Sequence, residues 1–434
     1  MGGEAAGGPR PGEALAGSVT TSYVRTMNKL VVQTTAAYPQ PSESAAARLL
    51  QLVHLTGSVP RAEATAKLGL PRSTASEAVS ELVALGLIAQ GPPARRAGAP
   101  RGRPSPQLYP DPAGPVVVVA RLDSSEAELA VVELGGSVAQ RRRIPLPAWG
   151  SDPRTTLSAL AGLMREAVAE SGRPCAGAAV GLAGMVRATD GLVHSALHLD
   201  WKSVPAAEIL AAELPEIPRV EVGKDASYAA LAEHCRGAGR GARTLLTLTC
   251  EHLGIGGAVL QQGVPFTGAG HAVEAGHVVV DPAGQPCPCG MRGCLEVSAD
   301  GRALLKGTPS DPGDPAEVED LLRRAAAGEP PAAARIAAAA ANLGRALASL
   351  TNLFDPDRVA LSGLLGEYLR IAPDRIHAEL EASVVARTQS PEVVVGSVAS
   401  PVLIGAAEQA FGRLLATPCL MATASPTRSR VVVR

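Results

Sequence analysis

Apolar and polar positions follow a helical period in the segment that begins at residue 41. Across residues 41–57 apolar side chains recur three or four positions apart, and Ser42 or Ser44 can cap the predicted helix. A second helix is predicted to end near Gly69, because glycine suits the turn after a helix. A third is predicted from Pro71 onwards, with an apolar stripe of Ala75, Val79, Leu82 and Val83. Two short helices joined by a tight turn are typical of a helix-turn-helix.

The segment after the third helix is typical of the wing of a winged helix. An apolar strand start leads into a tip rich in glycine and proline, and residues 106–110 predict a return strand. No acidic residue occurs between Ala89 and Pro110, and the tip carries four arginines, Arg95, Arg96, Arg101 and Arg103. We therefore expect a DNA-binding domain over residues 41–110 with a basic wing. A solvated linker is the alternative.

From residue 115 short apolar runs alternate with helical periods. Strands are predicted at residues 116–122, 128–134, 177–184, 244–250, 357–363 and 392–397, and residues 254–266 predict strands with a Gln-Gln-Gly turn at residues 261–263. Residues 219–234 predict a strand that runs directly into a helix, and further helices are predicted at residues 315–327, 333–353, 365–380 and 403–415. This alternation predicts an α/β fold, and the length suits two successive α/β halves.

Composition narrows the class of protein. The 434 residues suit two or three domains, and with 46% apolar but only 2% aromatic residues the core must consist of Ala, Leu and Val. A net charge of −1 requires any nucleic-acid footprint to be local. No apolar run could span a membrane and no secretory signal is visible, so we expect a cytoplasmic protein. Residues 1–40 are expected to be a disordered extension, with a short disordered tail from about residue 418.

Three of the seven cysteines lie close together as Cys-x-Cys-Gly-x-x-Gly-Cys, at Cys287, Cys289 and Cys294. Gly290 and Gly293 allow the chain to turn sharply between them. Clustered thiols in a reducing compartment favour a metal over disulfides, and a closed zinc site needs four ligands. We predict His277 as the fourth ligand. The alternative is a reduced cysteine cluster without metal, beside a core histidine.

The same stretch resembles the signature of a known family. Glu-x-Gly-His at residues 274–277, followed by the cysteine pattern and Glu296, is similar to the signature of the ROK family, which comprises repressors, uncharacterised open reading frames and sugar kinases. Further resemblance lies at residues 181–186, 196–205 and 342–363, and the whole covers residues 41 to about 415. Residues 41–109 resemble the winged-helix half of the repressor members.

The resemblance implies a two-lobed, actin-like fold of the ribonuclease-H type over residues 115–434. It implies a structural zinc held by His277 and the three cysteines, and sugar contacts from Glu274 and Glu296. His277 would serve both metal and sugar through its two ring nitrogens. Asp225 matches the family's base toward the sugar hydroxyl, while Lys224 beside it replaces an asparagine and changes the expected sugar specificity.

The phosphate-binding loops of a kinase are altered. Where the family has Asp-x-Gly-x-Thr, this chain has Arg121 in place of the aspartate and Asp123 in place of the glycine. In the second loop His252 and Leu253 replace Gly-Thr, although three glycines follow. Phosphoryl transfer depends on positioning and charge neutralisation, so we expect no enzymatic activity. If kinase activity survives, Asp225 is its base.

DNA contacts are expected at the start of the third helix. Arg72 suits guanine or phosphate, Ser73 and Thr74 suit phosphate, and Ser76 lies on the same exposed turn. The alternative is that these residues only cap the helix and face solvent. Helix-turn-helix proteins usually bind two-fold DNA sites as dimers, so we expect a homodimer or homotetramer.

These observations lead to one hypothesis and two alternatives. The favoured function is a transcriptional regulator of the repressor type that binds operator DNA and a sugar-like effector. The first alternative is an ATP-dependent sugar kinase with an accessory DNA-binding domain. The second is a DNA-binding regulator without any small ligand.

Overall fold

The computed structural model describes residue 2 and residues 44–92, 105–123, 126–145, 152–271, 273–308 and 314–420. Three predictions therefore lie outside the described residues: the N-terminal extension apart from Gly2, most of the C-terminal tail, and the wing arginines Arg95, Arg96, Arg101 and Arg103. The chain divides into the units Met1–Ala36 and Ala37–Arg434, and all elements below belong to the second unit.

Three helices form the predicted DNA-binding region, α2 (Ala45–Thr56), α3 (Arg61–Lys67) and α4 (Arg72–Ala84), of which α3 and α4 have the order of a helix-turn-helix. Ser44 caps α2, since its Oγ accepts a hydrogen bond from the Ala47 N–H at 3.1 Å. Ala75, Val79 and Leu82 are buried as the apolar stripe predicts, but the inclusion of Val83 in that stripe was wrong. Val83 is 40% exposed, because it follows Leu82 by only one position and points away from the buried side.

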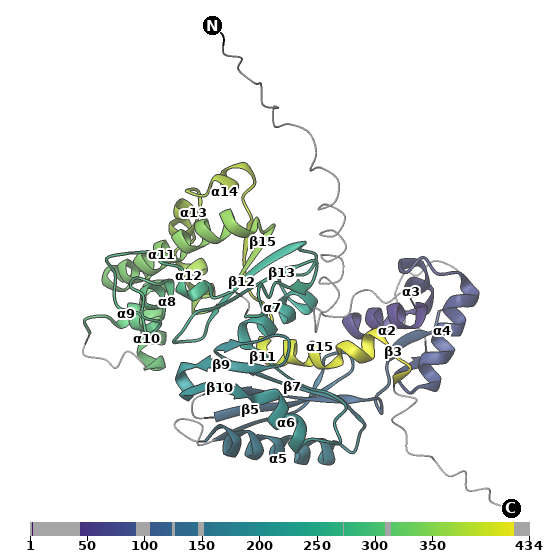
Figure 1. Ribbon diagram of the computed structural model, residues 1–434. Coiled ribbons are helices and arrows are strands. Elements are labelled where there is room, and N and C mark those ends of the chain that lie inside the picture. The colour runs from purple at the N-terminus through teal and green to yellow at the C-terminus, as the bar shows by residue number, and fades with distance from the viewer. Residues whose placement is uncertain are drawn as a thin grey trace, which may run out of the picture. The chain divides into compact units, whose positions relative to one another are not determined.

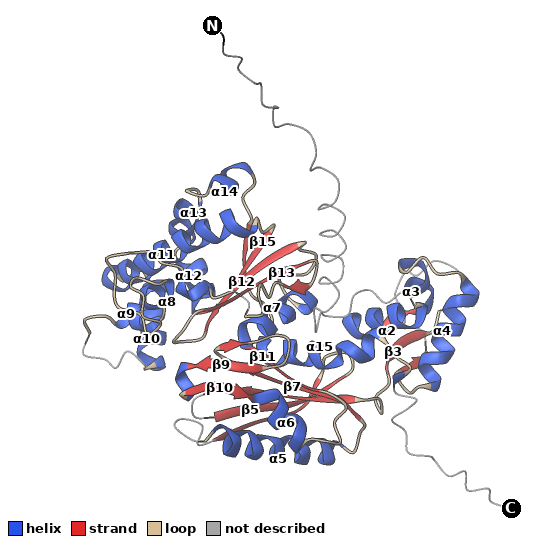
Figure 2. Cartoon of the chain, viewed as in Figure 1, coloured by secondary structure: helices blue, strands red, loops and turns tan. Residues whose placement is uncertain are grey.

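A three-stranded antiparallel sheet completes this part, in the order β1 (Val59–Pro60), β3 (Gln107–Pro110), β2 (Ile88–Gly91). The predicted strands before and after the wing tip pair directly, with Ala89 opposite Tyr109. Strand β1 was not foreseen, because two residues are too few to show a period. The arrangement is that of a winged helix (Figure 2).

Two larger sheets follow, each with five strands. The first has the order β11-β7-β4-β5-β6 and consists of β4 (Val116–Leu122), β5 (Glu126–Glu133), β6 (Val138–Pro145), β7 (Cys175–Leu182) and β11 (Val220–Lys224). The second has the order β14-β13-β12-β15-β16 and consists of β12 (Thr244–Cys250), β13 (Gly256–Gln261), β14 (Val264–Pro265), β15 (Arg358–Gly363) and β16 (Glu392–Val395).

The two sheets have the same topology. The central strands β4 and β12 each pair antiparallel with the next strand along the chain, and parallel with a later strand on the other side. The outer parallel strands, β11 and β16, complete the match. Two α/β halves of equal strand order confirm the expected two-lobed fold.

Helices cover both faces of each sheet. The helices of the first lobe are α5 (Pro153–Ser171), α6 (Ala206–Glu213) and α7 (Asp225–Arg236). Those of the second lobe are α8 (Leu295–Ala299), α9 (Gly301–Leu305), α10 (Pro315–Ala326), α11 (Pro330–Phe354), α12 (Leu364–Ile371), α13 (Pro373–Leu380), α14 (Val384–Thr388) and α15 (Pro401–Ala416). A small sheet, β10 (Trp201–Pro205), β9 (Leu192–Ala196) and β8 (Met185–Val186), with the short helix η1 (Leu197–Leu199), packs on the first lobe.

Two helices cross between the lobes. Helix α7 follows a strand of the first sheet, yet its Ala230 and Leu231 pack in a core with Leu245 and Leu260 of the second sheet. Helix α15 follows the second sheet, yet its buried side chains share a core with strands β4, β5 and β7 of the first sheet. In Figure 1, α7 and α15 accordingly lie between the two sheets.

One predicted helix was wrong in extent. Residues 365–380 form two helices, α12 and α13, rather than one. Pro373 occupies the first position of α13 and disfavours helical geometry at Ala372, which has φ −135° and ψ 50°. Within the described residues, no helix is both long and apolar enough to span a membrane.

Candidate ligand and metal site

The cysteine segment folds back on itself beside the short helix η2 (Ala275–His277). Val279 pairs with Cys294, and the Leu295 N–H donates to the Val278 carbonyl at 2.8 Å. Gly293 has φ +66°, and a Cβ there would lie 1.5 Å from a backbone oxygen of Asp281. Only glycine fits this crossing, which brings the third cysteine back to the first two.

The four predicted metal ligands converge. Cys287 Sγ lies 3.7 Å from His277 Nδ1, and Cys289 Sγ lies 3.7 Å from Cys294 Sγ. The four donor atoms all lie within 4.8 Å of one another. Tetrahedral zinc with bonds of about 2.3 Å places sulfur donors about 3.8 Å apart, so this donor set fits a zinc ion. A bound ion would join η2 to the start of α8, and His277 would keep Nε2 for another partner.

Lys224, the last residue of β11, lies in contact with the residues before η2. Its Nζ donates to the Val273 carbonyl at 2.7 Å and to Glu274 Oε1 at 2.8 Å. The Lys224 side chain is only 5% exposed, whereas that of Glu274 is 35% exposed. A nearly buried ammonium thus holds one of the predicted sugar-contacting carboxylates, which no sequence pattern indicated.

Asp225 is the first residue of α7. Its Oδ1 accepts a hydrogen bond from the Ala226 N–H at 2.6 Å. Part of the residue remains exposed, yet desolvation by the surrounding protein raises the pKa of its carboxyl, against the opposing effect of Lys224 and Arg121. An aspartate with a raised pKa is suited to accept a proton or a hydrogen bond from a ligand hydroxyl.

Glu296, in the first turn of α8, is also paired. Arg302 donates to Glu296 Oε1 at 3.0 Å and to the fully buried Asp300. Asp300 in turn accepts from the Gly254 N–H at 3.1 Å, so this cluster holds the second glycine loop. Sequence reasoning missed Arg302 and Asp300. The only signal was their closeness to Glu296 in the chain.

The two segments predicted to be altered phosphate loops contact each other. Arg121 Nη1 donates to both carboxylate oxygens of Glu251 at 2.7 Å, and Arg121 Nη2 lies 3.3 Å from Asp123 Oδ2. Burial would lower the pKa of Arg121, but Glu251 and Asp123 raise it above its ordinary value. Since Arg121 lies near the end of β4 and Glu251 directly follows β12, this ion pair joins equivalent ends of the two sheets. His198, whose pKa is lowered by burial, lies within electrostatic reach of Asp123 and Asp225.

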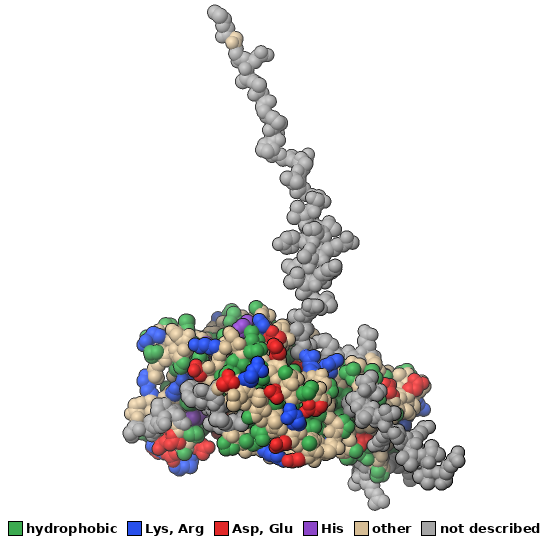
Figure 3. Space-filling view, turned by 60° about the horizontal axis from the view of Figure 1, so that its bottom comes forward, with side chains coloured by type: hydrophobic (Ala, Val, Ile, Leu, Met, Phe, Trp, Pro, Cys, Tyr) green, Lys and Arg blue, Asp and Glu red, His purple; other side chains and the backbone are tan. Residues whose placement is uncertain are grey.

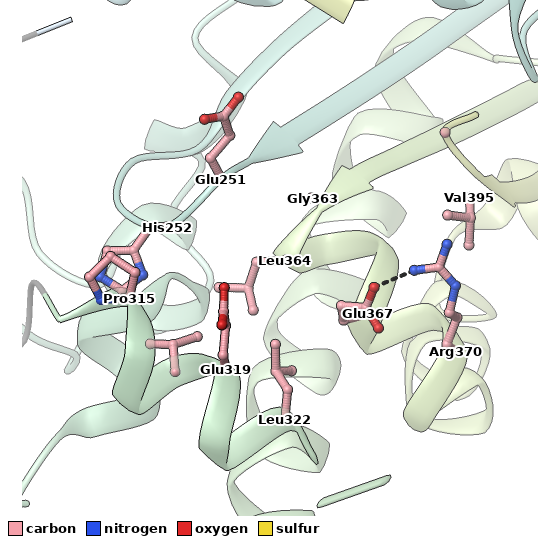
Figure 4. A pocket seen from close by; sticks show the side chains of 12 residues that line it. Glu251, His252, Pro315, Glu319, Leu322, Gly363, Leu364, Glu367, Arg370 and Val395 are labelled. Atoms are coloured by element: carbon pink, nitrogen blue, oxygen red, sulfur yellow. Dashed lines mark hydrogen bonds and ion pairs between the residues drawn. The ribbon is translucent and has the colours of Figure 1, made fainter. Parts of the chain in front are cut away.

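A cavity of about 440 Å³ opens beside Glu251. Figure 4 shows His252, Glu319 and Leu322 along its wall, and Glu367 bonded to Arg370. Two of its three carboxylates are paired, Glu251 with Arg121 and Glu367 with Arg370, and Glu319 leaves the cavity with a negative balance. That balance is unfavourable to a polyphosphate.

The predicted DNA-contacting residues lie at the start of α4. Arg72 and Ser73 are exposed, while Thr74 and Ser76 are half-buried. Ser76 Oγ accepts a hydrogen bond from Arg61 at 2.6 Å, so this serine also holds α3 against α4. On the face drawn in Figure 3, acidic and basic side chains are interspersed, as the near-neutral net charge leads one to expect.

Comparison with known proteins adds three findings. The DNA-binding transcriptional repressor Mlc of Escherichia coli (strain K12) is 31% identical over 217 residues, which are 48% of this chain and 52% of the repressor, so the match spans about half of that relative. A solved ROK family transcriptional regulator, described as a homologue of the E. coli MLC protein, shares the fold with a TM-score of 0.70 at 23% identity, over 88% of this chain and 98% of that one. A ROK hexokinase from Thermus thermophilus has a TM-score of 0.57 at 30% identity, over 69% of this chain and 99% of the hexokinase.

The family assignment rests on a longer match. The ROK family pattern matches residues 122–409, well over half of the chain, and this range includes the candidate metal ligands, Lys224 and Asp225. The shared fold of the two solved structures agrees with that match. This chain belongs to the ROK family.

Proposed function

We propose that this protein is a DNA-binding transcriptional regulator that responds to a sugar or sugar-derived ligand. The observation that carries the proposal is the ion pair of Arg121 with Glu251, where a kinase of this family has its phosphate loop. With Asp123 beside it, the cluster of one cation and two carboxylates has a net negative charge. It repels a polyphosphate instead of neutralising it.

The winged helix supports the DNA-binding half of the proposal. The similar protein Mlc is a DNA-binding transcriptional repressor. The solved ROK regulator aligns with 88% of this chain, whereas the hexokinase aligns with 69%. Arg72 and Ser73 at the exposed start of α4 would meet base edges and phosphates in the major groove. Two copies of the chain would bind the two halves of a two-fold operator.

The ligand would bind between the start of α7 and the metal cluster. Asp225, Glu274, His277 and Glu296 offer acceptors for sugar hydroxyls, and Lys224 offers a donor. Zinc bound by His277, Cys287, Cys289 and Cys294 would supply a rigid support for that loop. The role of these residues is to hold and orient the ligand.

Fluorescence anisotropy tests the proposal. The full chain is titrated into labelled DNA from the region upstream of its own coding sequence, over a range of salt concentrations. We expect saturable binding whose logarithmic affinity falls linearly with the logarithm of salt, because phosphate contacts release counterions. Absence of binding at moderate salt rejects the proposal.

A second candidate, a sugar kinase, is favoured by Asp225, whose carboxyl has a raised pKa and which matches the base of the family's kinases. A coupled assay of ADP release across glucose, mannose, xylose and N-acetylglucosamine separates the two. We expect no turnover above background. Turnover that disappears in Asp225→Asn would establish the kinase instead.

A further inference from the structure

Helix α7 connects the ligand site with the DNA-binding helices. It begins at Asp225 and ends at Arg236, and its 12 residues span about 18 Å at a rise of 1.5 Å each. At its first turn the chain contacts Glu274 through Lys224. At its last turn Arg236 contacts α2 of the winged helix.

The contact at the end of α7 is a buried ionic cluster of Arg236, Glu408 and His54. Arg236 Nε donates to Glu408 Oε1 at 2.5 Å, and His54 Nε2 lies 3.0 Å from Glu408 Oε2. His54 is fully buried and Glu408 is 1% exposed. Burial alone would raise the pKa of Glu408, but its interactions with His54 and Arg236 lower it to about 2.

A turn of the first sheet fixes the geometry of this cluster. The Gly135 N–H lies 2.9 Å from His54 Nδ1, so the other ring nitrogen, Nε2, faces Glu408. The Gly135 carbonyl accepts from Arg236 Nη1 at 2.8 Å. Three elements of the chain, α2, α7 and α15, therefore share one set of directional bonds.

Helix α15 packs against α7 without intervening space. A Cβ on Gly405 would lie 1.7 Å from the Tyr228 carbonyl oxygen, so the two backbones touch. Toward the winged helix, the Phe411 ring lies 5.3 Å from the His54 ring, and Gln51 Nε2 donates to the Leu415 carbonyl at 3.4 Å. Close-packed backbones transmit a displacement, since packed interiors resist compression.

The apolar core connects α15 with α2 and with α4, the helix that carries the predicted DNA contacts. One cluster of buried side chains contains Leu50 and Val53 of α2, Val79 and Leu82 of α4, and Phe411 of α15. Figure 1 shows α15 running from α7 toward α2. A shift of α7 therefore cannot occur without moving either α15 or the helices of the winged helix.

We propose that α7 and α15 transmit ligand binding at Lys224 and Asp225 to the winged helix through the contact of Arg236, Glu408 and His54. This inference rests on the proposed function, because it assigns the route by which the ligand site controls DNA binding. Such coupling requires a part of the protein that can adopt two arrangements. Ligand binding and DNA binding must each favour one of these arrangements over the other. The pair of crossing helices is that part.

The test perturbs one end of the route and observes the other. Lys224→Gln removes the ion pair with Glu274, and hydrogen–deuterium exchange is followed at the amides of α2 in the full chain. We expect the exchange rates of α2 to change by roughly fivefold or more, the lower range of allosteric coupling. When Lys224→Gln is combined with Glu408→Gln, it should change the exchange rates of α2 by less than about twofold, because the contact of Glu408 with Arg236 and His54 is weakened.

Two further variants make the outcome decisive. Glu233→Gln is the control, because it also removes a buried carboxylate from α7. The backbone N–H groups that bond to Glu233 belong to Ala238, Ser397 and Val398, which lie outside α2. This variant should leave the response of α2 to Lys224→Gln intact. Arg236→Lys, which lacks the forked donors, replaces Glu408→Gln if that variant does not fold. An unchanged α2 in Lys224→Gln, or an equal response with and without Glu408, overturns the inference. Neither measurement requires DNA, so failure of DNA binding would reject the regulator and leave the route standing.

Discussion

At the residue scale, the charged groups of the candidate ligand site are already paired within the chain. Lys224 holds Glu274, Arg302 holds Glu296, and Arg121 holds Glu251. A ligand hydroxyl that binds one of these carboxylates meets an acceptor whose orientation is fixed beforehand. Such preorganisation lowers the cost of binding a neutral polyol.

Asp225→Asn is expected to stabilise the protein without ligand. The folded state raises the pKa of this carboxyl, so above that raised pKa the ionised group costs stability relative to the unfolded chain. The cost shrinks as pH falls and disappears below the ordinary value of 3.8. The thermal unfolding midpoint of Asp225→Asn should therefore exceed that of the wild type at pH 7 and approach it near pH 3.

The control for that experiment is Asp374→Asn, at an exposed position in the first turn of α13. It should leave the midpoint nearly unchanged at both pH values. A lower midpoint for Asp225→Asn at pH 7 would contradict the assigned pKa shift.

Cys289→Ser is expected to abolish metal binding. It removes one of four donors from a set whose separations fit tetrahedral zinc. Elemental analysis of purified protein should give about one zinc per wild-type chain and far less per variant chain. The matched control is Cys419→Ser, an exposed cysteine outside the cluster, which should retain the metal. Wild type and Cys289→Ser found equally free of metal would reject the site.

The convergence of His277 and the three cysteines could be predicted from the sequence, because these residues are close in the chain and their spacing is restrictive. The ion-pair partners of the charged side chains could not be predicted from the sequence. Glu251 lies 130 positions from Arg121, and Glu408 lies 354 positions from His54. Such pairs depend on how the two lobes meet, which no local pattern encodes.

At the element scale, the start of α4 carries the DNA contacts of the proposal. Arg72→Ala is expected to weaken binding to promoter DNA by about 1–3 kcal/mol if Arg72 reads a base, or by less and uniformly if it meets only phosphate. Anisotropy titrations against promoter and unrelated DNA distinguish these cases. Arg375→Ala, which removes one exposed arginine from α13, is the charge-matched control and should bind as the wild type does. Equal affinities for both variants would remove α4 from the DNA interface.

Most long elements could be predicted from periodicity, since α2, α10, α11 and α15 each show a clear apolar stripe. Helix α5 and strand β6 were among the elements not predicted, and other errors have local causes. Residues 365–380 keep a helical pattern of apolar positions across Pro373, although the proline ends one helix and begins another. Strand β1 and the short helices α8 and α9 have too few residues for a period to appear.

At the scale of the whole molecule, the equal strand order of the two sheets explains where the ligand site and the route lie. Crossing helices α7 and α15 each leave one lobe and cover the sheet of the other. A ligand that binds between the lobes therefore acts on both helices. The same helices contact α2, and under the proposal this contact carries the effect of ligand binding to the winged helix.

The most direct measurement is the affinity of the full chain for its own promoter DNA, by fluorescence anisotropy, with and without each sugar of a panel. We predict that at least one sugar changes this affinity without ATP. We also predict that Glu274→Ala still binds the DNA but loses the response. The contradicting result is an affinity that no sugar changes, while thermal shift shows that one of those sugars is bound.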